Sequence, residues 1–240
     1  MKKYVVSLFF IAFGLNAAAE IQQGRIENLL SLSEQYRHDG ANCFASVVYA
    51  SGLIDDSAYI SSRFYEAAVR TPYCQKLPSL GALQKGDVVV LGSPHDQDTG
   101  LWMHALLALG DGKAFAKMGY KKEDKTIVTS LQENINFYRD QDSAIRASEY
   151  RCDFVGLRQT IEQSDLRDSW GSLLRIRQQL FKELRQEQTM DHEAVTQMLG
   201  QVDEAIDHSK STKQIKDLVR ELLLSTREQI HLMDDFIVEM

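Results

Sequence analysis

Cysteine, clustered positive charge and long apolar runs are all scarce in this chain. Lys and Arg number 27 against 34 Asp and Glu, which gives a formal net charge of -7, and no basic cluster stands out. Nucleic-acid binding is therefore disfavoured, because it depends on concentrated positive charge. The apolar stretch from Tyr4 to Leu15 is shorter than the roughly 20 residues that a membrane-spanning helix needs. No internal repeat or low-complexity segment is evident.

The N-terminal residues are typical of an export signal. Lys2 and Lys3 give a positive start, an apolar run follows, and Ala17 to Ala19 form an A-x-A cleavage site before Glu20. No lipobox cysteine follows the apolar run. We therefore expect residues 1–19 to be a signal peptide. The mature chain is expected to be periplasmic or secreted, with no stable membrane anchor after cleavage.

The three cysteines are an odd number, which in an exported chain favours one free thiol. Cys74 and Cys152 lie outside helical patterns, so we expect them to form a disulfide and to leave Cys43 free. Closing so long a loop is worth roughly 4 kcal/mol in the chain-entropy model. Two alternatives stay open at this point: a bridge from Cys43 to either of the others, and no bridge at all.

Hydrophobic periodicity predicts helices early in the chain and strands in its middle. Helices are expected over 21–37, from Cys43 to near Gly52, and from Asp56 or Ser57 to Arg70. Strands are expected over 86–91, 101–109, 113–118, 127–131 and 148–154, with a polar loop at 92–100 and a hairpin turn at 110–112. Helices followed by a small antiparallel sheet indicate an α+β fold.

The composition changes beyond Leu157. This part has no Pro and no Cys, and its apolar residues recur at helical spacing with breaks near 189–191 and 208–212. We therefore expect a domain over 20–157 followed by a helical region over 158–240, folded as a hairpin or small bundle. The helical region is expected to pack on the rest of the chain or on a protein partner, and no chemistry is assigned to it.

Cys43 occupies a position suited to a nucleophile. Gly40 allows a tight turn, Asn42 is a preferred N-cap residue, and Phe44 begins a helical pattern. Unpaired N–H groups and the positive end of the helix dipole would then face the sulfur. They should lower the thiol pKa from roughly 8.5, and they could hold an oxyanion. The competing interpretation is a small buried side chain without chemistry.

His104 is the leading candidate for the base that such a thiol needs. It lies in an apolar strand, where a histidine is otherwise costly, and the alternative is a core histidine with a satisfied backbone bond.

Four side chains close together in the sequence offer nitrogen and oxygen ligands for a metal, but their spacing matches no metal-binding signature. No metal and no other cofactor is predicted for this group, which comprises His95, Asp96, Asp98 and His104.

These segments together resemble the NlpC-type cell-wall cysteine peptidases, a group with a papain-like fold that includes the CHAP amidases. Members typically have a Cys-containing helix, a Gly-Asp strand, and a His opening a strand that ends at a Gly-(Asn/Asp)-Gly-Lys hairpin. The same order occurs here, within about Tyr36 to Phe115, as Cys43, Gly86-Asp87, His104 and Gly110-Asp111-Gly112-Lys113. The resemblance implies a papain-like domain that cleaves peptide or amide bonds of peptidoglycan, with Cys43 as nucleophile and His104 as base.

Two departures from the family pattern affect the expected site. Family members usually have Asp-Cys-Ser-Gly, whereas this chain has Asn42 before the cysteine and Phe44-Ala45 after it. The residue that normally orients the histidine falls at Ala116, which has no polar group. Candidates for that third role are Lys117, whose ammonium cannot accept an N–H, and Gln132 or Glu133. Tyr36 and Asn42 are expected to line the site.

A second hypothesis follows from these departures. The chain would then be a catalytically inactive module of the same fold, which binds cell-wall fragments or a periplasmic protein through its C-terminal helices.

Overall fold

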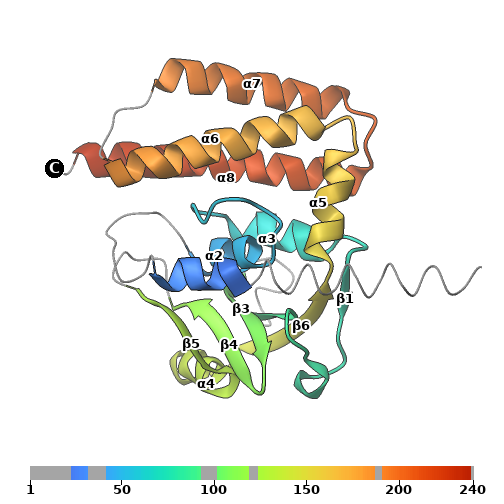
Figure 1. Cartoon of the computed structure of the whole chain (residues 1–240), viewed down its shortest axis with the longest axis vertical. Helices are drawn as coiled ribbons and strands as arrows, with labels where there is room; N and C mark the ends of the chain where they lie inside the picture. Colours follow the sequence, from blue (N-terminus) through green and yellow to red (C-terminus); the bar gives the residue numbers. More distant parts are fainter. Residues whose placement is uncertain (1–22, 32–41, 93–101, 119–123, 187–190, 239–240) are drawn as a thin grey trace, which may run out of the picture.

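Within the residues that the computed structural model describes (23–31, 42–92, 102–118, 124–186 and 191–238), a six-stranded antiparallel sheet lies at the centre of the fold (Figure 1). The strand order is β1-β6-β2-β3-β4-β5. The strands are β1 Cys74–Lys76, β2 Val88–Gly92, β3 Trp102–Gly110, β4 Lys113–Lys117, β5 Thr126–Ser130 and β6 Arg146–Cys152. The predicted α+β class is confirmed, and all five predicted strands are present with shifted ends.

Helices cover both faces of the sheet. A helix over 23–31, α2 (Cys43–Ala50) and α3 (Ser62–Val69) lie on one face, and α4 (Leu131–Gln141) lies on the other (Figure 1). A short helix, α5 (Phe154–Glu162), leads into three long helices that run side by side beyond α2 and α3. These are α6 (Arg167–Gln186), α7 (His192–His208) and α8 (Lys213–Val238). The predicted C-terminal helices and the break near 208–212 are confirmed, whereas the predicted break near 189–191 lies mostly outside the described residues.

The sheet separates two apolar cores. The larger core contains Cys43, Val47, Phe64 and Ala105, and it continues without interruption into side chains of α6, α7 and α8 such as Leu218. The smaller core lies between the sheet and α4. Because successive strand residues face opposite sides, Ala105 and Leu107 of β3 face the larger core, while Leu106 faces the smaller one.

A bulge changes this alternation at the start of β3. Leu91 is opposite His104 and Gly92 is opposite Trp102, so Met103 is an extra residue on β3. Trp102 consequently packs edge-on against Tyr65 of α3, with ring centroids 5.8 Å apart. His104 lies on the α4 side of the sheet instead. Strict alternation would have put both rings on one face.

The disulfide prediction is confirmed: Cys74 and Cys152 are bonded across the paired strands β1 and β6, and Cys43 is free and buried. The hairpin at 110–112 is also confirmed, with positive φ values at Gly110, Asp111 and Gly112.

Two local predictions were wrong, and one helix was missed. Helix α3 begins at Ser62 rather than near Asp56, because Ser61 caps it and the Asp56 carboxylate accepts hydrogen bonds from the Ala58 amide and from Arg177. Helix α4 was not predicted at all. Helix α5 begins at Phe154, where a strand was expected to end.

Buried polar contacts attach the long helices to the loop before α3. The Arg177 guanidinium of α6 donates to both carboxylate oxygens of Asp56 and to the carbonyl oxygens of Ala58 and Tyr59. From α8, the Gln229 side chain accepts from the Tyr59 amide. The helical region therefore packs directly on the sheet domain. Within the described part of the chain, no helix combines the length and apolar character that crossing a bilayer requires.

Candidate functional site

Cys43 is the first residue of α2, and the cap before it forms as predicted. The Asn42 side chain accepts from the Ala45 amide at 2.9 Å, and the Asn42 carbonyl accepts from the Ser46 amide at 3.0 Å. The Asn42 amide group donates to the Ile60 carbonyl at 2.7 Å, which fixes the cap against the loop before α3. The amides of Cys43 and Phe44 have no acceptor within the helix, as expected at a helix start. They face the Cys43 sulfur.

The Cys43 thiol pKa moves in the direction opposite to the prediction. Burial raises the pKa of the Cys43 thiol to about 11, and this effect exceeds the opposing hydrogen bonds from the backbone amides of Ala105, Phe44 and Cys43 and the charge of Lys117. The helix start does favour the thiolate, as predicted, but the sulfur is buried in the larger core, with only 6 % of the residue exposed. Desolvation therefore outweighs the local donors.

His104 is almost completely buried, and its ring stacks on Tyr138 of α4 with centroids 4.3 Å apart. Its Nδ1 lies 3.0 Å from the Tyr138 hydroxyl oxygen, and that hydroxyl donates its hydrogen to the Met118 carbonyl at 2.8 Å. Among the described residues, the His104 Nε2 has no hydrogen-bond partner. Burial lowers the pKa of His104 to about 3, so the ring is neutral at physiological pH.

The structure brings the Cys43 sulfur to the strand that contains His104. The sulfur accepts from the amide of Ala105, the residue directly after His104. At this end of β3 the pairing with β4 has stopped, since it runs from Gly110 to Leu107 within the described residues. The Cys43 thiol thus contacts β3 from the face of the sheet that α2 covers. The His104 imidazole lies on the opposite face, which α4 covers. The two are not hydrogen-bonded here, and their cooperation stays a prediction. Catalytic hydrogen bonds are often long before substrate binds.

The predicted candidates for the third residue lie elsewhere. Glu133 accepts from Thr129 and from the Ser130 amide as part of the α4 capping box, and Gln132 donates to Asn136 on the surface of α4. Lys117 is buried on the α2 face of β4, and its charge acts on Cys43. Tyr36 lies outside the described residues.

Tyr138 is the site residue that the sequence analysis missed. It comes from α4, the helix that was not predicted, and the signal for that helix was present. Ser130 and Glu133 form a capping box, and Leu131, Ile135 and Tyr138 follow at helical spacing.

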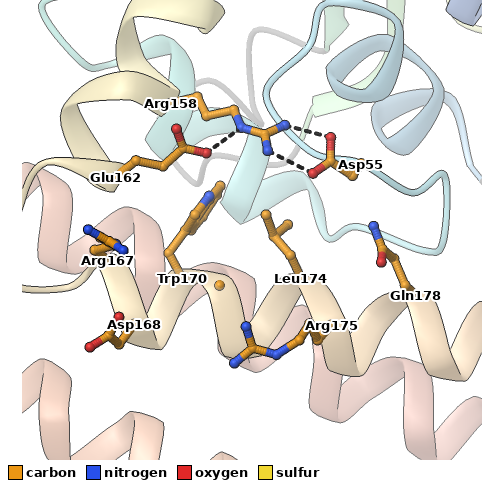
Figure 2. Close-up of a pocket in the computed structure, with 10 residues that line it drawn as sticks. Asp55, Arg158, Glu162, Arg167, Asp168, Trp170, Leu174, Arg175 and Gln178 are labelled. Carbon is orange, nitrogen blue, oxygen red and sulfur yellow. Dashed lines mark hydrogen bonds and ion pairs between the residues drawn. The ribbon is translucent and has the colours of Figure 1, made fainter.

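A surface pocket of about 600 Å³ lies away from these residues, between α5, α6 and the loop before α3 (Figure 2). Its wall is strongly ionic. Arg158 donates to both oxygens of Asp55 and to Glu162, and Arg25 also donates to Asp55. Trp170 forms the apolar side of the pocket. These ion pairs already satisfy one another, and none of the predicted site residues lines the pocket.

Within the described ranges, no group of three or more His, Cys, Asp or Glu side chains is placed to bind one ion. His95, Asp96 and Asp98 lie outside those ranges.

Comparisons of the sequence and the structure with protein-family models, with characterised proteins and with solved structures found no match.

Proposed function

We propose that this chain is an exported cysteine hydrolase of papain-like fold that cleaves peptide or amide bonds of peptidoglycan, with Cys43 as nucleophile and His104 as base. The main supporting observation is the position of the Cys43 sulfur. It lies among the amides at the start of α2 and at the amide directly after His104, whose Nε2 is unpaired among the described residues. A Cys-bearing helix packed on an antiparallel sheet supports the proposal of a papain-like fold.

The mechanism starts from a neutral pair. The thiol pKa near 11 and the His104 pKa near 3 mean that neither group is charged at pH 7. His104 Nε2 takes the proton from the Cys43 sulfur as the sulfur attacks the carbonyl carbon, and the amides of Cys43 and Phe44 hold the developing oxyanion. The leaving amine takes the proton from His104 and a thioester remains. Water then attacks the thioester, giving its proton to Nε2, and the thiol is restored.

The test is hydrolysis of purified peptidoglycan fragments by the mature protein and by Cys43→Ala. Loss of product in the variant is expected, because the nucleophile is gone. Cys43→Ser is a matched variant that keeps the shape of the side chain but offers a much weaker nucleophile, and it should also be inactive or nearly so. Equal product from all three proteins would exclude Cys43 as the nucleophile.

A binding module of the same fold is the second candidate, and the burial of Cys43 favours it. In that case cell-wall fragments or a periplasmic protein partner bind without being cleaved. Calorimetric titration of wild type and Cys43→Ala with the fragments separates the two functions. Equal binding by both proteins, with no product from either, would support the module and contradict the hydrolase.

A further inference from the structure

The Tyr138 hydroxyl has one hydrogen and two neighbours. One neighbour is the Met118 carbonyl oxygen at 2.8 Å, which can only accept. The other is the His104 Nδ1 at 3.0 Å. Because the hydroxyl hydrogen is committed to the carbonyl, the Tyr138 oxygen can bond to Nδ1 only by accepting from an Nδ1–H group.

This Nδ1–H bond to the Tyr138 oxygen determines the protonation state of the other ring nitrogen, Nε2. A neutral histidine has one N–H and one lone pair, so a hydrogen on Nδ1 leaves the lone pair on Nε2. Nε2 is the buried nitrogen that has no partner among the described residues. It is therefore an unsatisfied acceptor on the strand whose Ala105 amide contacts the Cys43 sulfur.

We propose that Tyr138 is the positioning residue of this site: it holds His104 in the Nδ1–H tautomer and leaves the Nε2 lone pair open for the proton of Cys43. The catalytic part of this inference rests on the proposed hydrolase, whereas the tautomer does not. Ring stacking with His104 and the anchor to Met118 fix the orientation as well as the tautomer. A tyrosine supplied by α4 thus fills the role that Ala116 cannot.

The tautomer can be observed directly. In protein labelled with ¹⁵N-histidine at pH 7, long-range ¹H–¹⁵N correlation spectra distinguish a protonated ring nitrogen from one with a lone pair. The chain has six histidines, so the His104→Gln variant identifies the signals of His104. Wild type should show hydrogen on Nδ1 and none on Nε2. Tyr138→Phe keeps the stacked ring but loses the hydroxyl, and the Nε2–H form should appear.

A matched control is Tyr73→Phe, which removes a hydroxyl bonded to Thr160, away from His104. It should leave the His104 signals and the hydrolysis rate unchanged. In the same proteins, Tyr138→Phe should lower kcat on the order of 10²-fold with little change in KM, because the base is misoriented rather than the substrate site altered. A urea midpoint for each variant shows that it remains folded.

The possible outcomes distinguish the positioning role of Tyr138 from the proposed hydrolase activity. Hydrogen on Nε2 in wild type, or unchanged His104 signals in Tyr138→Phe, would overturn the positioning role whether or not the protein cleaves peptidoglycan. Absence of hydrolysis in wild type, together with the expected tautomer, would instead remove the hydrolase proposal and leave the assignment of Tyr138 in place.

Discussion

At the scale of single residues, Cys43 makes folding depend on pH in a specific window. Burial raises its thiol pKa from 9.0 in the unfolded chain to about 11 in the folded protein. The unfolded chain therefore loses the proton first, so the stabilising contribution is complete below pH 9 and is lost as pH rises to 11. Two units correspond to about 3 kcal/mol at most.

The measurement is the free energy of unfolding in urea at several pH values from 7 to 11, for wild type and for Cys43→Ala. Because the other two cysteines are bonded to each other, Cys43 is the thiol that can titrate. Wild type should lose stability relative to the variant across the window. Parallel curves for the two proteins would contradict the raised pKa.

Asn42 should contribute to stability in two ways. Its side-chain oxygen caps α2 and its amide group pairs with the buried carbonyl of Ile60. Losing the cap costs about 1 kcal/mol, and leaving a buried carbonyl unpaired costs about 1–3 kcal/mol more. Asn42→Ser keeps a capping oxygen but cannot reach Ile60, so stability should decrease in the order wild type, Asn42→Ser, Asn42→Ala. Equal urea midpoints for the two variants would show that the cap contributes nothing.

Local sequence was informative where a residue acts on its own chain neighbours. The Asn42 cap depends on the three residues that follow it. The disulfide was expected from an odd cysteine count together with the positions of Cys74 and Cys152 outside helical patterns. Both were therefore predictable. The thiol pKa was not, because its main cause is burial by side chains far along the chain. The orientation of Trp102 was not predictable either, since one extra residue at Met103 moves its ring to the face opposite His104.

At the scale of elements, the strands were easier to predict than the helices that cover them. β-branched and apolar runs bounded by glycine mark β2 and β3 clearly. Helix α4 is polar on most of its surface and buries few side chains, so its apolar pattern is weak and only the capping box indicates it. The candidates Gln132 and Glu133 do lie on this helix, but on its exposed surface, whereas Tyr138 of the same helix contacts His104.

The pairing of α6 with the loop before α3 depends on a buried ion pair. The side chains of Arg177 and Asp56 are 0 % and 1 % exposed. Arg177→Met should destabilise the protein by about 3–5 kcal/mol, because it leaves a buried carboxylate without its cation. The double variant Arg177→Met/Asp56→Leu should recover part of this loss, since it leaves no unpaired charge.

An exposed pair supplies the control for that measurement. Arg220 and Asp207 are 37 % and 67 % exposed, and Arg220→Met should cost less than about 1 kcal/mol in the same urea titration. Similar losses at the two arginines would mean that burial of the Arg177 pair does not determine its contribution.

At the scale of the whole molecule, one apolar core joins parts that the sequence analysis divided at residue 157. Side chains of α2, α3 and the sheet share that core with α6, α7 and α8. A shared core predicts cooperative unfolding of both parts. The change in composition at Leu157 therefore marks a change in secondary structure, and we expect the two regions to behave as a single folding unit.

The two tryptophans of the chain allow this to be tested, because Trp102 belongs to β3 and Trp170 to α6. Trp170→Phe leaves fluorescence from the sheet, and Trp102→Phe leaves fluorescence from the long helices. In each variant the fluorescence transition in urea should coincide with the loss of helical circular dichroism, which comes mainly from α6, α7 and α8. Comparing both signals within one variant removes any effect of the substitution on stability. A sheet signal that changes at a different urea concentration from the helical signal would instead establish two independently folding domains, with a boundary near residue 157.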